Sequence, residues 1–114
     1  MTEMDFELVP PHGAFVVIRN GEETMAGGAL RRLSDGVGEI ERMWTAPQAR
    51  GRGYARRVLA VLEATAMDYG YRTLQLKAAT LQVAAIALYR SVGYEPIEAT
   101  GLAGDFVFFA KRLS

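Results

Sequence analysis

The stretch "ARGRGYARRVLAVLEA", residues 49–64, changes character halfway along. Its first half gathers arginines around Gly51 and Gly53, and its second half is apolar at helical spacing. From Ala55 onward the apolar residues recur at intervals of three and four, which predicts one buried helix face. The residues of this face are Val58, Leu59, Leu62, Ala66 and Tyr69, and Gly70 is predicted to end the helix. A glycine loop that opens a helix therefore organises the second half of the chain.

The residues before the loop have the patterns of strands joined by tight turns. Strands are predicted for "GAFVVIR" (13–19), "TMAGGALRRL" (24–33) and "VGEIERMWT" (37–45). Asn20–Gly21 is a strong hairpin-turn signal, and Gly27 and Gly28 weaken or bulge the second strand. Residues 1–12 are interpreted as a polar or extended lead. Residues 13–45 are therefore expected to form an antiparallel meander.

Beyond the first helix, strands and helices are expected to alternate. "RTLQLKA" (72–78) and "DFVFFAKRL" (105–113) predict strands. Between them lies a second helical stripe, ended by Gly93 and made of Ala85, Leu88, Tyr89 and Val92. The expected fold is α/β (α+β), with a mixed, mainly antiparallel sheet flanked by helices. The 114 residues suit one domain, in which 46–114 form the second half.

Composition restricts the possible functions. Thirteen basic residues balance thirteen acidic ones, so no overall field attracts nucleic acid or a membrane surface. Cysteine is absent, which leaves out disulfides, thiolate metal sites and a cysteine nucleophile. No metal-ligand constellation is present, and His12 is expected to be a surface loop residue. The N-terminal stretch is too short for a signal peptide and no apolar run could span a membrane, so we expect a cytoplasmic protein.

The glycine loop has the features of a phosphate cradle. The first turn of a helix has unpaired N–H groups and the positive end of the helix dipole, and glycines leave those groups accessible. The loop has neither the Gly-Lys-Ser/Thr ending of a nucleotide P-loop nor a dinucleotide fingerprint. A pyrophosphate is therefore the predicted ligand, with further charge available from Arg50, Arg52, Arg56 or Arg57. The alternative is a tight turn whose arginines form a solvated face.

Two motifs carry a family resemblance. "MWTAPQARGRGYARRVLAVLEATAMDYGYRTLQLKA" (43–78) resembles the acetyl-CoA-binding core of the GNAT superfamily of acyl-CoA N-acyltransferases. The family signature Arg/Gln-x-x-Gly-x-Gly/Ala corresponds here to the segment from Arg50 to Ala55. Downstream, "AAIALYRSVGYEPI" (84–97) looks like the family's second helix, with Ala-x-x-x-Tyr followed by Gly-Tyr. The resemblance covers roughly residues 13–113.

The resemblance implies a binding mode for acetyl-CoA as cosubstrate. The loop and the first helical turn would hold the pyrophosphate through Arg50, Gly51, Arg52, Gly53, Tyr54, Ala55 and Arg56. In the family the preceding strand splays from the next one, so Met43, Trp44 and Thr45 would pair with the pantetheine arm. The side chains of these three residues also suit a core. Gln82 stands where the family often has Asn, and it would reach a pantetheine amide.

The implied reaction is N-acetylation of a primary amine. With no cysteine to carry the acetyl group, direct attack in a ternary complex fits better than a covalent intermediate. Tyr89 is the candidate acid beside the sulfur, and Glu39 is the candidate base, acting through a water. Glu41 is the alternative base on the same strand face. The structural alternatives are that Tyr89 is one more member of the apolar stripe and that the strand carboxylates are inert.

The chain departs from the family at its N-terminus. Family members usually begin with a strand and two helices that wall the acceptor pocket, and a dozen residues before position 13 are too few for these. The bare face that results predicts a homodimer, or a partner chain that completes the site. A non-catalytic CoA-binding sensor or subunit is the alternative function. The acceptor amine itself is not specified by the sequence.

Overall fold

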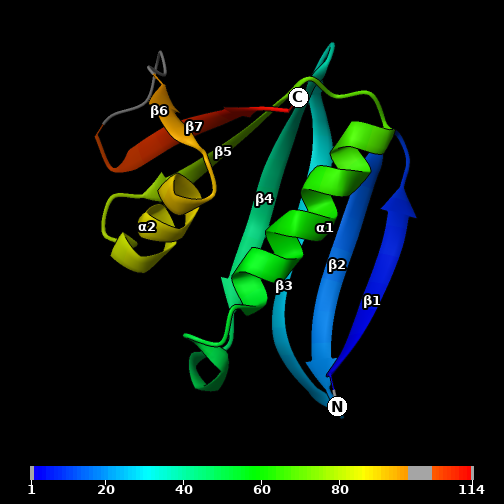
Figure 1. Ribbon diagram of the computed structural model, residues 1–114, viewed down its shortest axis with the longest axis vertical. Coiled ribbons are helices and arrows are strands. Elements are labelled where there is room, and N and C mark those ends of the chain that lie inside the picture. The colour runs from blue at the N-terminus through cyan, green and yellow to red at the C-terminus, as the bar shows by residue number, and fades with distance from the viewer. Residues whose placement is uncertain (1, 98–103, 114) are drawn as a thin grey trace.

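A seven-stranded sheet and two helices make up the computed structural model, which describes residues 2–97 and 104–113 (Figure 1). The strands are β1 (Thr2–Val9), β2 (Gly13–Asn20), β3 (Glu23–Ser34), β4 (Val37–Thr45), β5 (Thr73–Ala79), β6 (Glu95–Ile97) and β7 (Phe106–Arg112). The helices are α1 (Tyr54–Asp68) and α2 (Val83–Ser91), with a short 3₁₀ turn at Pro47–Ala49. The strand order is β1-β2-β3-β4-β5-β7-β6, and only the β4–β5 pair is parallel.

The predicted fold class is confirmed, and the five predicted strands begin and end within one residue of their expected bounds. Two strands were missed. Residues 2–9, expected to be a polar or extended lead, form β1, so the expectation that the first strand is lacking is wrong. The signal was the alternation of Met4, Phe6 and Leu8 with acidic residues, a period of two that favours a strand even though acidic residues are depleted there. The second is β6, which has only three residues.

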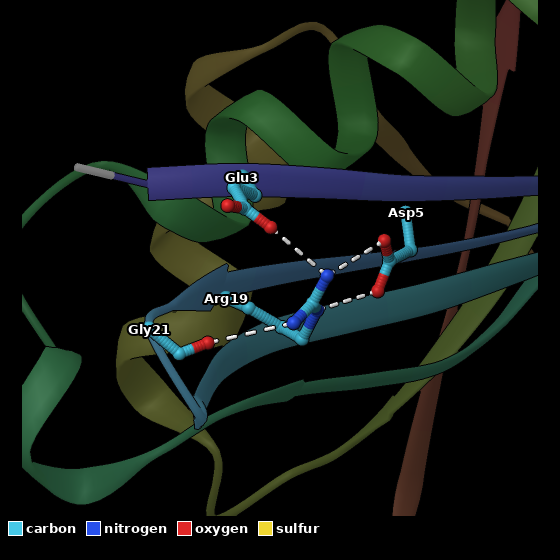
Figure 2. Close-up of polar contacts among 4 residues, drawn as sticks. All are labelled: Glu3, Asp5, Arg19 and Gly21. Carbon is cyan, nitrogen blue, oxygen red and sulfur yellow. Dashed lines mark hydrogen bonds and ion pairs between the residues drawn. The ribbon is translucent and has the colours of Figure 1, made fainter.

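Charged side chains fasten β1 to β2. Arg19 Nε donates to Asp5 Oδ2 at 2.6 Å, and its Nη2 donates to Glu3 Oε2 at 3.0 Å (Figure 2). A third contact, from Arg19 Nη1 to the Gly21 carbonyl at 3.4 Å, holds the guanidinium over the hairpin turn. The hydrogen bond from Arg19 lowers the pKa of the Asp5 carboxyl. Since these groups are exposed, they fix register more than they add stability.

Both helices lie on one face of the sheet, which we call the helix side; the opposite face is the open face. On β2, Ala14, Val16 and Ile18 point into the core beneath α1, while Phe15 points to the open face. The segment that follows α2 is linked to the second half of α1 on the helix side. Tyr94, just after α2, donates a hydrogen bond to Glu63 of α1 at 2.7 Å, and Lys111 of β7 pairs with the same carboxylate at 3.0 Å.

Gly28 allows α1 to approach the sheet closely. A Cβ at this position would collide with Met43 Sδ and lie 3.0 Å from Val58 Cγ1. The predicted irregularity beside Gly27 and Gly28 is present as a register shift between β3 and β4. Glycine here therefore serves helix–sheet packing, a role that its strand pattern alone does not reveal.

The sheet divides where β4 and β5 part. Their parallel pairing covers only three residue pairs, ending at Glu39 and Gln75, and beyond it the two strands diverge (Figure 1). A bulge places Arg42 and Met43 of β4 opposite the single residue Gly28, and Arg42 has a φ of +57°. We call the resulting opening the fork. The N-terminal end of α1 follows β4 at one side of the fork, and α2 follows β5 at the other (Figure 1).

Within the described parts of the chain, 2–97 and 104–113, no helix is long and apolar enough to cross a membrane.

Candidate active site

A groove of about 910 Å³ lies on the helix side of the fork, between the beginnings of α1 and α2. We call it the helix-side cavity. Its lining residues come from the end of β4, the glycine loop, the first turn of α1, the residues just before α2 and α2 itself. They include every residue predicted to bind the cofactor except Arg52: Met43, Trp44, Thr45, Arg50, Gly51, Gly53, Tyr54, Ala55, Arg56, Gln82 and Tyr89.

The glycine loop leaves the beginning of α1 open. Gly51 and Gly53 have φ of +77° and +80°, a conformation that favours glycine. Apart from the adjacent backbone, no atom of the described residues lies within 4 Å of a Cβ built at either position. Gly53 is the N-cap residue, and no side chain caps the helix. The first backbone hydrogen bond of the helix runs from the Arg57 N–H to the Gly53 carbonyl at 3.1 Å. The earlier N–H groups therefore remain available to an anion.

The four arginines of the loop differ in what they contact. Arg56 donates to Ser91 Oγ at 3.1 Å, which ties α1 to the last turn of α2. Arg57 lies over the Tyr54 ring, with 5.9 Å from its guanidinium carbon to the ring centroid. Arg50 lines the helix-side cavity, and Arg52 is exposed outside it. Neither Arg50 nor Arg52 forms an ion pair with any residue that the structure describes.

The end of β4 forms one edge of the fork. Met43 packs on the core from the helix side, whereas Trp44 lies opposite Gly27 on the open face and is 38% exposed. Thr45 follows, opposite Ala26. Because pairing with β5 has ended at Glu39, the backbone edge of these residues that faces β5 has no partner strand. The splayed edge that the resemblance implied is thus a feature of this chain.

The Gln82 side chain turns back onto the strand that precedes it. Its Oε1 accepts a hydrogen bond from the Ala79 N–H at 3.0 Å and does not cap α2. Its neighbours Leu81 and Val83 are 91% and 72% exposed and line the cavity with Ala84, Ala85 and Leu88. These lining residues were not predicted from the sequence to belong to the site. The only signal was the pair of large apolar residues beside Gln82 at the beginning of a helix.

Tyr89 projects from α2 into the wall of the helix-side cavity. Its ring is only 6% exposed and packs on Tyr94 and Phe109, with centroid distances of 6.2 and 6.3 Å. Burial raises the pKa of its phenol, and no hydrogen bond contributes. Among the described residues no buried side-chain oxygen lacks a partner, so the unpaired Tyr89 hydroxyl is the part of the residue that reaches the cavity.

A second, smaller cavity of about 320 Å³ lies on the open face of the fork, and we call it the open-face cavity. Charged residues of β3, β4 and β5 provide most of its lining, which consists of Arg31, Glu39, Ile40, Glu41, Arg42, Lys77 and Phe108. Glu39 and Glu41 share one strand face, as predicted, because the bulge begins only at Arg42.

Arg31 bridges the two carboxylates of the open-face cavity. Its Nη2 lies 2.7 Å from Glu39 Oε1, and its Nε lies 3.2 Å from Glu41 Oε2. The hydrogen bond with Glu39 is the largest cause of the raised pKa of Arg31. Sequence reasoning missed Arg31, because a partner eight residues away across a hairpin is visible only when the register is known.

The candidate acid and the candidate base lie in different cavities. Tyr89 lines the helix-side cavity and Glu39 lines the open-face cavity. The two cavities meet along β4, where residues 39–42 line the open-face cavity and residues 43–45 line the helix-side cavity. His12 lies away from both, in an exposed turn, with its ring 5.3 Å from that of Tyr69. No cluster of three or more potential metal ligands occurs within the described ranges.

Comparisons with known proteins agree with this geometry. Residues 2–94 match the sequence model of the Acetyltransferase (GNAT) family. An IAA acetyltransferase from Azospirillum brasilense is 35% identical over 88 residues, which are 76% of this chain and 58% of that protein. The chain thus spans less than two thirds of this relative's length.

Two solved structures illustrate the likeness in fold. A putative acyl-CoA N-acyltransferase from Klebsiella pneumoniae superposes with a TM-score of 0.83 at 34% identity, covering 95% of this chain and 77% of that one. The PaiA N-acetyltransferase from Thermoplasma acidophilum, solved in complex with coenzyme A, has a TM-score of 0.77 at 13% identity. It covers 87% of this chain and 60% of that one, and its likeness concerns the fold alone.

Proposed function

The chain belongs to the Acetyltransferase (GNAT) family, and from this premise we propose that it moves an acetyl group from acetyl-CoA to a primary amine. The proposed route is direct attack by the amine in a ternary complex. The observation that carries the proposal is the unpaired Tyr89 hydroxyl, which opens into a cavity that begins at an uncapped glycine loop. Together these supply an anion cradle and a proton donor in one groove.

The helix-side cavity suits coenzyme A along its length. The pyrophosphate would lie on the free N–H groups of the first turn of α1, next to Gly51 and Gly53, where no protein atom competes for the space. Arg50 would add charge to the phosphates, since it lines the cavity and has no ion-pair partner among the described residues. The pantetheine arm would follow the free edge of β4 through Met43, Trp44 and Thr45.

The proposed chemistry requires one proton at the sulfur and the removal of another from the nitrogen. The neutral amine attacks the thioester carbonyl carbon, and the C–S bond breaks as the new C–N bond forms. Tyr89 would give its proton to the departing thiolate, because a phenol with a raised pKa holds that proton at neutral pH. Glu39 would receive the proton from the amine nitrogen through a water, since it lines the cavity on the other face of the fork.

Two measurements on the full chain test this proposal. Calorimetric titration with acetyl-CoA and with dephospho-CoA measures the cofactor affinity and whether an arginine contacts the ribose phosphate. Thiol release from acetyl-CoA with a panel of primary amines then measures turnover. Tight binding with turnover is expected. Binding without turnover across the panel would favour the sensor alternative, and no binding at all would remove both.

A homodimer remains part of the proposal. Its support is that Phe15, Trp44 and Phe106 are exposed on the open face, and monomers seldom leave large apolar patches uncovered. Light scattering at micromolar concentration should give twice the mass of one chain. A sharply monomeric profile would contradict the dimer and leave the acetyl-transfer proposal untouched.

A further inference from the structure

The cations of the open-face cavity fall into two groups. Arg31 is occupied by both carboxylates of the cavity, those of Glu39 and Glu41. Arg42 and Lys77 line the same cavity, and neither forms an ion pair with any residue in the described ranges 2–97 and 104–113. One part of the cavity is therefore acidic, with two carboxylates sharing the single Arg31, and another part carries two positive charges without a counterion among the described residues.

The geometry of the fork explains why these two cations are unpaired. If the parallel register between Glu39 and Gln75 continued, Glu41 would lie opposite Lys77. The strands diverge instead, and Glu41 turns to Arg31 on the other side, at 3.2 Å. Lys77 then lies over the Phe106 ring, with its Nζ 5.1 Å from the centroid. The missing ion pair is thus a consequence of the same divergence that opens the cavity.

The bulge in β4 provides the second cation. Arg42 has a φ of +57°, a conformation that non-glycine residues seldom adopt. This turn of the backbone breaks the alternation of β4, so that Arg42 lines the cavity next to Glu41. Backbone strain of this kind persists where the surrounding structure enforces it, and it is common at ligand sites.

We propose that the open-face cavity binds an acceptor that carries a carboxylate beside its amine, an amino acid or a similar amino carboxylate. This inference rests on the proposed function, and it names the substrate class. The amine would lie toward Glu39 and Glu41, and the carboxylate would lie between Arg42 and Lys77, where it supplies the missing counterion. A volume of about 320 Å³ suits a small molecule.

The same charges disfavour other amines. A polyamine or an aminoglycoside carries further positive charges, and these would meet Arg42 and Lys77 without compensation. A simple alkyl amine would leave both exposed cations without a counterion and would gain no attraction from them. The discrimination is therefore expected both from attraction to the carboxylate and from rejection of its analogues.

The test compares each of the standard amino acids with its own carboxamide, a pair of similar size that differs in the negative charge. Because the carboxamide's amine is less basic, kcat/KM is expressed per concentration of neutral amine. Thiol release from acetyl-CoA by the full chain should give a kcat/KM about 10-fold higher for the best acid than for its carboxamide, the size expected for one charged hydrogen bond. Lys77→Gln and Arg42→Gln should each abolish most of this preference. Arg90→Gln is the matched control, because this arginine is exposed on α2 away from the cavity.

A binding measurement separates this inference from the proposed function. The same pairs are titrated calorimetrically into the chain saturated with CoA, so that the readout does not require turnover. Preferential binding of the acid that depends on Lys77 and Arg42 supports the inference even if no acetyl transfer occurs. Equal binding of acid and carboxamide, no binding of either, or a preference that survives both substitutions would overturn it.

Discussion

The two cavities at the fork differ in the chemical groups that line them. The helix-side cavity is lined by the glycine loop, the end of β4, Arg50, Arg56 and mainly apolar residues of α2, and burial raises the pKa of the Tyr89 phenol in its wall. The open-face cavity is lined by five charged side chains, of which Arg31 pairs with both carboxylates. The shape of the first therefore depends on the backbone, whereas the second depends on how side chains pair across strands.

In a transferase, a cofactor site made by the backbone can keep its shape while the sequence changes. An acceptor site made by side chains can be specific to one chain. A pyrophosphate is recognised by N–H groups, which almost any sequence with the right glycines presents. An acceptor is recognised by side chains, and these change without disturbing the sheet. We therefore expect substitutions on the helix side to act on CoA and on the chemical step, and substitutions on the open face to act on the acceptor.

The largest expected effect comes from Tyr89. Tyr89→Phe removes the proposed acid and keeps the ring that packs on Tyr94 and Phe109, so kcat should fall about 100-fold while the Kd of CoA stays the same. Because the pKa of Tyr89 is raised, wild-type kcat should not decline for lack of this proton until the pH exceeds about 10. Steady-state kinetics from pH 6 to 10.5 measures both. Full turnover by the variant would remove Tyr89 from the mechanism.

The second prediction tests whether backbone N–H groups at the beginning of α1 bind the pyrophosphate. Gly53 and Gly70 stand at opposite ends of α1, both with positive φ and both with open space where a Cβ would be. Alanine at either position should cost about 1–2 kcal/mol of the free energy of unfolding, because of the left-handed conformation. Only Gly53→Ala also places a methyl group at the proposed pyrophosphate site.

Acetyl-CoA affinity should therefore fall about 10-fold in Gly53→Ala, which corresponds to about 1.4 kcal/mol, and stay unchanged in Gly70→Ala. Calorimetry provides the affinities, and chemical denaturation provides the stabilities. Equal losses of affinity in the two variants would mean that helix strain, and not an occupied cradle, weakens binding.

The contrast between the cavities also marks what could be predicted from the sequence. The helices and five of the strands follow from periodicity, because burial on one face imposes a period of 3.6 or of two. The glycine loop and Tyr89 were identified from local motifs, and local motifs fix local backbone. β1 was missed because acidic residues disfavour a strand in isolation, whereas in the sheet two of them pair with Arg19 of the neighbouring strand.

The open face was less predictable for a physical reason. The Arg31 bridge, the unpaired Lys77 and the direction of Arg42 depend on the β3–β4 register, the divergence of β5 and one bulge. Each of these is decided by packing between residues that are distant along the chain. Glu39 could be predicted as a candidate base from its position in the strand, but its ion-pair partner Arg31 could not be predicted.

A third prediction concerns Tyr94, the buried tyrosine that packs beside Tyr89 on the helix side. The pKa of Tyr94 is raised by burial and by its hydrogen bond to Glu63, so the neutral phenol is favoured in the folded chain. Its contribution to stability is complete below the unfolded pKa of about 10 and is lost as the pH rises toward the higher folded pKa.

Tyr94→Phe should therefore cost about 1 kcal/mol at pH 7, where Glu63 keeps Lys111 as a partner. Above pH 10 the cost should shrink, because only in the wild type is the unfolded state stabilised by ionisation of the now exposed Tyr94 phenol. Denaturation midpoints at pH 7 and pH 10.5 measure this, with CoA affinity unchanged at pH 7. A cost that grows with pH would contradict the sign, and a loss of CoA affinity would extend the ligand site beyond the cavity wall.

The smallest effect is expected on the open face, at the candidate base. Glu39 is held by Arg31 at 2.7 Å and is proposed to act through a water, so it contributes less than a base in direct contact, which supplies 100-fold or more. Glu39→Gln should lower kcat/KM about threefold at pH 6.5, far below that hundredfold. The loss should disappear near pH 9, where free amine is plentiful. Glu41→Gln is the matched control, since it removes the other carboxylate on Arg31 and should leave the pH profile unchanged. Identical profiles for the two variants would reduce Glu39 to a structural partner of Arg31, and the open face would then select the acceptor without taking part in the proton transfer.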